Sequence, residues 1–189
     1  MTDPGPLKDL ERALASAETI VAGIGSAQWT APTPCADLDV RAVANHLVTG
    51  NLRSAALVRG TPPPDGGADL LGDDPAGAFS QAAAELRAAL GAPGAIDEVY
   101  KTPQGGSAPG AVLAQVRTLE QLGHGWDLAQ ATGQEADFPS DVTERALATA
   151  RLMLSPRPEG PDAPYGPPVP VPDSAPLIDQ LAGYLGRAV

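Results

Sequence analysis

The sequence predicts an all-α fold, a four-helix bundle with additional short helices. A length of 189 residues suits one domain with a sizeable core. Hydrophobic residues make up 43% of the chain, but much of this share is alanine and aromatic residues are only 4%. A core of Ala, Leu and Val favours closely packed helices over a β-sandwich. Five stretches also carry apolar residues at helical spacing.

The first two helices follow from apolar spacing and from signals at their ends. A helix is expected from about Leu7 to Ile24, where apolar residues recur every three or four positions and Gly25 suits the end. A loop interrupted by prolines follows. The second helix is expected after Asp39, a good N-cap residue, and continues to Gly60.

Three more helices are expected in the middle of the chain. Asp74 and Pro75 form an N-cap and N1 pair that opens a third helix after a long loop without periodicity. The stretch DEVYKTPQGGSAPG predicts a short β-hairpin or an irregular turn. The segment Ser107–Pro109 is expected to open the fourth helix, which ends at Gly133. A fifth helix is expected at about Ser140–Leu154.

The last part of the chain is rich in proline. The stretch SPRPEGPDAPYGPPVPVPDSAP predicts an extended segment over the surface, since proline interrupts regular structure. A polyproline ligand for another domain is the alternative, but a short helix follows at about Leu177–Gly186. We therefore expect a helical bundle over residues 1–157, and over 158–189 a Pro-rich segment with a short helix packed on the bundle.

Charge and cysteine content exclude several classes of protein. The formal net charge of −11 argues against a duplex nucleic-acid binder, which needs Lys and Arg at the phosphates. The single Cys35 excludes an internal disulfide and fits a reducing cytosol. No signal peptide is visible, and no segment approaches the roughly 20 apolar residues of a membrane span. We expect a cytoplasmic protein with neither a nucleic-acid nor a membrane partner.

The fourth helix carries charged residues on an apolar face. On a helical wheel, Glu120 and Asp127 lie near the middle of this face and His124 lies on its flank, beside the apolar residues Val112, Val116, Leu119 and Gly123. The i, i+4 spacing brings Glu120 and His124 together. A carboxylate that faces a core has to be protonated, paired or bound to a metal. Gly123 and Gly125 allow either close helix approach or room for a ligand beside His124.

His46, the other histidine of the chain, lies at the edge of the apolar face of the second helix. Two histidines and one glutamate from facing helices form a His₂Glu set, which is typical of catalytic zinc with an open fourth position. Asp127 would then hold a ligand imidazole or a bound water. The alternative is a solvated Glu-x-x-x-His pair, which is common on helix surfaces, and spacing alone favours it.

Other side chains near these positions have two interpretations. Asn45 and Asn51 would donate hydrogen bonds to a ligand or be solvated, and Trp126 would line a pocket or anchor the packing. Cys35 is a fourth ligand, a reactive thiol or a small buried residue. Arg41 and Arg53 of the second helix would either pair with an anionic substrate or carry ordinary surface charge. For each of these residues the structural interpretation is favoured.

Three motifs resemble a known family. TPCADLDVRAVANHLVTGN and TLEQLGHGWDLAQATG resemble the metal-binding domain of mycothiol-dependent maleylpyruvate isomerases, within the DinB/YfiT-like superfamily. YGPPVPVPDSAPLIDQLAGYLGR looks like the tail of a short, single-domain branch. The resemblance implies an up-down-down-up four-helix bundle that holds one divalent metal. By motif, His46, Glu120 and His124 are its ligands, with Zn²⁺ favoured and Ni²⁺ or Mn²⁺ as alternatives.

The resemblance also implies a chemistry. The superfamily includes thiol S-transferases and thiol-dependent isomerases that use mycothiol or bacillithiol. We therefore expect an enzyme whose metal activates a small thiol, with mycothiol as co-substrate and an electrophilic substrate as the second partner. A zinc-bound thiol is deprotonated at neutral pH and becomes a ready nucleophile. Related bundles often pair, so a homodimer is predicted.

Two features depart from the family pattern. The isomerases have a second domain that contributes to catalysis, for which this chain is too short. Leu38 replaces the aromatic residue that is usual before the second helix. Two other functions therefore stay open. One is a non-enzymatic, regulatory module of the same fold that binds a metal or small molecule. The other is a structural or dimerisation role for the Ala-rich faces.

Overall fold

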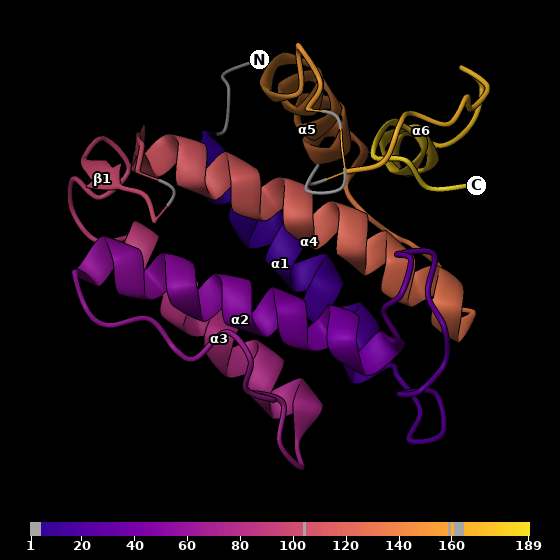
Figure 1. Ribbon diagram of the computed structural model, residues 1–189, viewed down its shortest axis with the longest axis horizontal. Coiled ribbons are helices and arrows are strands. Elements are labelled where there is room, and N and C mark those ends of the chain that lie inside the picture. The colour runs from indigo at the N-terminus through magenta and orange to yellow at the C-terminus, as the bar shows by residue number, and fades with distance from the viewer. Residues whose placement is uncertain (1–4, 104, 159, 161–164) are drawn as a thin grey trace.

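The computed structural model describes residues 5–103, 105–158, 160 and 165–189 (Figure 1). This part of the chain is helical apart from one small antiparallel sheet, which confirms the all-α class. The elements are α1 (Pro6–Ala22), α2 (Val40–Arg59), α3 (Pro75–Leu90), β1 (Val99–Lys101), β2 (Ser107–Pro109), α4 (Gly110–Thr132), α5 (Ser140–Met153) and α6 (Leu177–Tyr184).

The first four helices surround the core. Helix α4 packs against α1 and α2, and α3 packs against the other sides of the same two helices. Their inward faces are apolar because Leu, Val and Ala recur at helical spacing; Leu10, Leu14, Leu47, Phe79 and Trp126 are among the fully buried side chains. The up-down-down-up topology stays a prediction. No helix in the described ranges is both long and apolar enough to cross a membrane.

The ends of α2 and α3 lie where the sequence predicted them. The backbone N–H of Ala42 donates to the Asp39 carboxylate at 2.8 Å, so Asp39 is the N-cap of α2. Gly60 ends this helix in the left-handed region, with φ 66°. Asp74 caps α3 in the same way through the N–H of Gly77. Local capping chemistry therefore accounts for these boundaries.

The predicted start of α4 was wrong. Ser107–Pro109 is not helical but pairs with Val99–Lys101 as the second strand of a hairpin, one of the two forms expected for this stretch. The helix begins at Gly110, whose N–H donates to the Glu98 carbonyl at 2.9 Å. A Cβ at Gly110 would lie 2.0 Å from the Ala95 carbonyl oxygen, so the turn requires glycine here. Tertiary pairing overrides the local preference.

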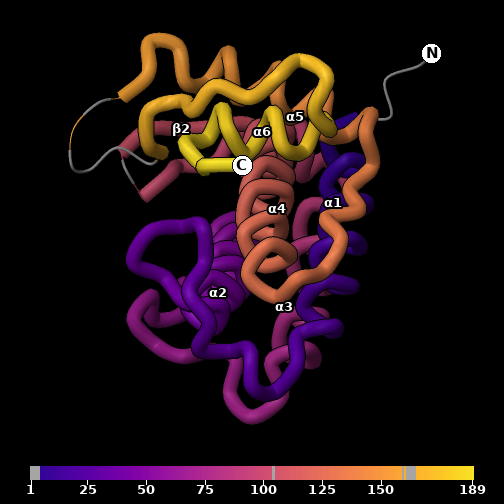
Figure 2. The backbone as a smooth tube through the Cα atoms, turned by 90° about the vertical axis from the view of Figure 1, so that its right-hand side faces the viewer, coloured from indigo at the N-terminus to yellow at the C-terminus, as the bar shows by residue number. Residues whose placement is uncertain are grey.

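The C-terminal segment runs back across the bundle. Helix α6 packs against α5 and α4, and Figure 2 shows both short helices lying over one side of α4. The N–H of Val169 donates to the Gly183 carbonyl at 2.9 Å, which ties the Pro-rich segment to α6. The chain leaves α6 at Tyr184 and turns inward again at Arg187, a buried residue. The division of the chain at residue 157 stays a prediction.

Candidate metal centre

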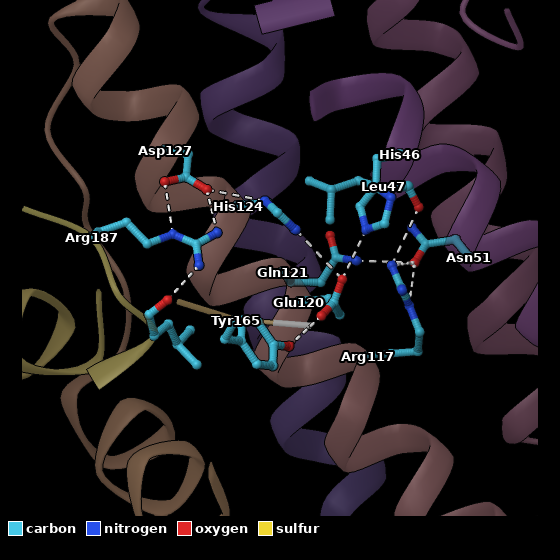
Figure 3. A network of polar contacts seen from close by, with 11 residues as sticks. His46, Leu47, Asn51, Arg117, Glu120, Gln121, His124, Asp127, Tyr165 and Arg187 are labelled. Atoms are coloured by element: carbon cyan, nitrogen blue, oxygen red, sulfur yellow. Dashed lines mark hydrogen bonds and ion pairs between the residues drawn. The ribbon is translucent and has the colours of Figure 1, made fainter. Parts of the chain in front are cut away.

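Helices α2 and α4 bring three possible metal ligands together (Figure 3). His46 Nε2 lies 2.9 Å from Glu120 Oε2, and the same oxygen lies 3.6 Å from His124 Nε2. The two imidazole rings meet edge to face, with centroids 4.8 Å apart. One helical turn separates Glu120 and His124, so α4 presents both on the side that faces α2.

The separations fit a divalent ion. Two ligand atoms that each lie about 2.0–2.1 Å from a tetrahedral zinc are roughly 3.3 Å apart. The ligand atoms of His46, Glu120 and His124 all lie within 4.8 Å of one another. The His46 side chain is 50% exposed, whereas those of His124 and Glu120 are 10% and 15% exposed. The cluster is therefore anchored in the core on one side and open to solvent on the other.

The charges around the cluster favour a cation. Burial alone would raise the pKa of Glu120, but hydrogen bonds with His124 and His46 hold that pKa well below its usual range. Burial would lower the pKa of His124, yet contacts with Asp127, Cys35 and Glu120 raise it well above the usual value. The carboxylates thus attract positive charge to His124, which a proton or a metal ion can supply.

Asp127 holds His124 from behind. Its Oδ2 lies 3.0 Å from His124 Nδ1, on the ring edge opposite the nitrogen that faces Glu120. Arg187, near the C-terminus, donates to both oxygens of Asp127, at 3.2 Å from Nε and 2.8 Å from Nη2. All three side chains are buried. A carboxylate on Nδ1 fixes the imidazole so that Nε2 points at a ligand position.

A tyrosine from the Pro-rich segment reaches the cluster from the other side. The Tyr165 hydroxyl donates to Glu120 Oε1 at 2.5 Å. Burial, together with the charge of Glu120, raises the pKa of Tyr165 well above its usual value, so the residue stays a neutral donor. Tyr165 and Arg187 were not found from the sequence, because neither lies in a segment whose spacing relates it to α2 or α4.

Two residues considered for the site, Asn45 and Trp126, form hydrogen bonds that hold other segments. Asn45 had two interpretations, a hydrogen-bond donor to a ligand or a solvated residue. Its amide donates to the Ala68 carbonyl at 3.0 Å and accepts from the Leu70 N–H at 2.8 Å. It holds the loop after α2 instead. Trp126 was expected at a pocket wall or as an anchor, and it is an anchor: its indole N–H donates to Asp179 of α6 at 2.8 Å.

Three other open assignments are decided in part. Cys35 is half-buried and packs against the hydrophobic core, and its Sγ also lies within 4.8 Å of possible ligand atoms of His124 and Asp127, so its interpretations stay open. Arg41 forms an ion pair with Asp69. Asn51 is fully buried rather than solvated, and it accepts from Arg117 and Gln121.

A cavity of about 450 Å³ opens beside His46. Helices α2 and α4 form its long walls, and the loop after α2 and the β1–β2 hairpin form its rim. Val116, which was assigned to the apolar face of α4, lines this cavity and is 36% exposed. Enzyme pockets that take small molecules have volumes of about 300–1,000 Å³, so the space fits a small substrate next to the cluster.

The chain matches known proteins over most of its length. Residues 10–129 match the family model described as the mycothiol maleylpyruvate isomerase N-terminal domain. Two uncharacterised proteins of Mycobacterium tuberculosis, from strains CDC 1551 and H37Rv, are each 34% identical over 184 residues, which is 97% of this chain and 98% of theirs. No solved structure matches the chain significantly.

Proposed function

Because the chain belongs to the mycothiol maleylpyruvate isomerase N-terminal domain family, we propose that it is a metal-dependent enzyme acting on a small thiol. The thiol, mycothiol or a close analogue, would be activated for S-transfer or for thiol-dependent isomerisation. The observation that carries the proposal is the set of ligand atoms from His46, Glu120 and His124, which lie within 4.8 Å of one another beside an open cavity.

The residues of this chain would have separate tasks at such a centre. His46, Glu120 and His124 would hold the ion, with Zn²⁺ favoured by the nitrogen and oxygen ligand set and its open position. When bound, zinc lowers the pKa of a coordinated thiol, which is then a nucleophile at neutral pH. Asp127 would orient His124, and Tyr165 would hold Glu120 Oε1 and leave Oε2 directed at the ion.

The open side of the cluster would admit the reactants. The half-exposed His46 side chain lines the cavity, so an electrophilic acceptor in this cavity would lie next to an activated sulfur. Holding both reactants at one place replaces a bimolecular encounter by a local one. A cytoplasmic location and a homodimer stay predictions.

A turnover assay tests the proposal. The purified protein with Zn²⁺ and mycothiol is mixed with 1-chloro-2,4-dinitrobenzene, whose ring carbon accepts the thiolate sulfur while chloride leaves and the thiol proton passes to solvent. Metal-dependent product formation is expected, and Glu120→Gln is expected to lower kcat/KM about a hundredfold or more, an effect of order 3 kcal/mol. The matched control is Glu144→Gln, because Glu144 is an exposed residue of α5.

The alternative is a module of the same fold that binds a metal or a small molecule without turnover. A protein that binds zinc at one ion per chain but forms no product with mycothiol and any of several acceptors would support this alternative. Equal activity of Glu120→Gln and the wild type would contradict the proposed centre.

A further inference from the structure

The cavity beside His46 is positively charged, although the chain as a whole is acidic. Besides His46, its titratable lining residues are Arg53 of α2 and Arg117 of α4, and no Asp or Glu is among the described residues that line it. The chain has a net charge of −11. A local reversal of charge in a concave site concentrates anions there.

These two arginines differ from the others in the described part of the chain. Arg12, Arg41, Arg59, Arg87, Arg145 and Arg187 each form an ion pair with a carboxylate. Arg151 and Arg157 lie over the ring of Tyr184. Arg53 and Arg117 have neither kind of partner among the described residues, and both line the same cavity.

Arg117 is buried in the cavity wall and is held there by hydrogen bonds. It is only 6% exposed, and its Nε and Nη2 donate to the neutral Oδ1 of Asn51 at 3.2 and 3.0 Å. A Cβ on Gly50 would lie 2.4 Å from Arg117 Nη1, so this part of α2 has space for the guanidinium only because residue 50 is glycine. The charge of Glu120 acts on Arg117, but among the described residues no carboxylate forms an ion pair with the guanidinium. A buried cation without an anion in contact is costly, which indicates that an anion completes the site.

Thr49, like Asn51 and Gln121, has a buried polar side-chain atom without a hydrogen-bond partner in the described structure. This residue is 9% exposed and lines the cavity, and its buried Oγ1 has no hydrogen-bond partner in the described structure. Buried hydroxyls nearly always have a partner, so an unpaired one at a cavity wall marks a place for a ligand atom. Thr49 follows His46 by one turn of α2, and Arg53 follows Thr49 by another.

We propose that Arg117, Arg53 and Thr49 bind the carboxylate of a small organic anion whose apolar body lies against Leu57, Leu113 and Val116. Arg117 precedes Glu120 by three residues, about one turn or 5 Å along α4. A molecule anchored there would extend its other end toward His46. The inference deepens the proposed function, since it names the class of acceptor. Binding of the anion itself does not require the metal.

The test is a titration with benzoate, followed by calorimetry or by NMR. Wild type is expected to bind benzoate at least about tenfold more tightly than benzamide, which has the same shape without the charge. Arg53→Gln and Arg117→Gln are each expected to weaken benzoate binding about tenfold, the loss of one charge-assisted hydrogen bond. Arg53 is exposed, so its variant keeps the test valid if Arg117→Gln does not fold.

Thr49→Val separates binding from stability. Its hydroxyl has no partner, so the variant is expected to bind benzoate several-fold more weakly while its Tm stays the same or rises. The matched control is Thr143→Val, a buried residue outside the cavity whose hydroxyl donates to the Pro139 carbonyl. The Tm of this control is expected to fall, whereas its affinity for benzoate is expected to stay unchanged. Equal binding of benzoate and benzamide, or tighter binding of inorganic phosphate, would overturn the assignment.

The same titration after treatment with a chelator distinguishes this inference from the proposed function. Benzoate binding that survives chelation and depends on Arg53 and Thr49 supports the subsite. The same result in a protein that never binds zinc would support the anion subsite and contradict the metal-dependent function. Benzoate binding that disappears with the metal and is unaffected by Thr49→Val would show that the carboxylate binds the ion, and the inference would be wrong.

Discussion

Asp127 links the C-terminal end of the chain to the candidate metal centre, because His124 and Arg187 share its carboxylate. We expect Asp127→Asn to weaken zinc binding about 10–100-fold, as loss of a partner behind a ligand histidine commonly does. Arg187 would stay buried without a counter-charge, so the free energy of unfolding should fall by about 3–5 kcal/mol. Zinc titration and urea unfolding measure the two effects.

The control for this prediction is Asp179→Asn. Asp179 also accepts a hydrogen bond from an α4 side chain, that of Trp126, but it lies outside the cluster. Its variant should keep the zinc affinity of the wild type. A similar loss of zinc affinity in both variants would contradict a specific role for Asp127.

A substitution at Tyr165 perturbs Glu120 without removing its carboxylate. Tyr165→Phe removes the hydroxyl that donates to Glu120 Oε1 and leaves the ring in place. The carboxylate then has one contact fewer to hold it, so zinc affinity should fall by a factor near ten, whereas stability should change by only about 1 kcal/mol. Tyr184→Phe is the control, and unchanged zinc affinity in Tyr165→Phe would show that the hydroxyl does not hold the carboxylate.

Helical spacing and family resemblance were enough to predict the four central residues of the cluster. Glu120, His124 and Asp127 lie on one helix, so their proximity is a local property of α4. Tyr165 and Arg187 contact this helix across 45 and 60 residues of sequence, through a Pro-rich segment without periodicity. The hydrogen bonds of Asn45 to the loop after α2 could not be predicted, because its position beside His46 gave no indication that this loop needs its amide.

At the level of the elements, two glycines let other segments approach α4. A Cβ on Gly125 would lie 2.5 Å from Phe138 Cζ, and one on Gly123 would lie 3.0 Å from Leu185 Cδ1. These contacts show close packing at both positions. Gly125→Ala should therefore lower the free energy of unfolding by about 1–3 kcal/mol, more than the gain in helix propensity offsets.

Gly123→Ala provides the comparison for this prediction. The end of the flexible Leu185 side chain can move by a few tenths of an ångström, so the loss should be smaller than for Gly125→Ala. Urea unfolding of both variants measures the difference. A larger loss for Gly123→Ala would contradict the assignment of Phe138 as the tighter contact.

Helix α5 is tied to α1 by a charge cluster that responds to pH. Hydrogen bonds from Arg12 and then Arg145 hold the pKa of Asp141 well below its usual value. A carboxyl whose pKa is depressed in the folded state stabilises the protein above its unfolded pKa of about 3.9, and this contribution is lost as the pH falls further. Wild type should thus exceed Asp141→Asn in stability at pH 7, by a margin that shrinks below about pH 4.

Thermal unfolding of both proteins between pH 7 and pH 2.5 checks this dependence. Glu144→Gln, a change at an exposed position of the same helix, should show no such margin at any pH. A margin between wild type and Asp141→Asn that stays constant down to pH 2.5 would mean that the charge of Asp141 does not stabilise the fold.

Element boundaries could be predicted where the signal was local and not where pairing was long-range. Asp39, Gly60 and Asp74 lie at the ends of α2 and α3 because capping depends on neighbouring backbone groups. Ser107–Pro109 carries helix-start residues, yet it pairs with Val99–Lys101 across a turn, and this contact is not visible from the local pattern.

In the whole molecule, the bundle and the C-terminal segment contribute to one site. The family match ends at residue 129, whereas the two mycobacterial relatives align with 97% of this chain. The segment after residue 129 supplies Tyr165 to Glu120 and Arg187 to Asp127. The C-terminal segment therefore supports the candidate ligands as well as covering α4 (Figure 2).

Elemental analysis of the purified protein tests the central claim most directly. We expect close to one zinc per chain in the wild type, and a large loss of zinc in His46→Ala, Glu120→Gln and His124→Ala. Asn45→Ala, in which the ligand set is intact, should keep its zinc. A wild type without stoichiometric metal, or a metal content that His46→Ala leaves unchanged, would contradict the account.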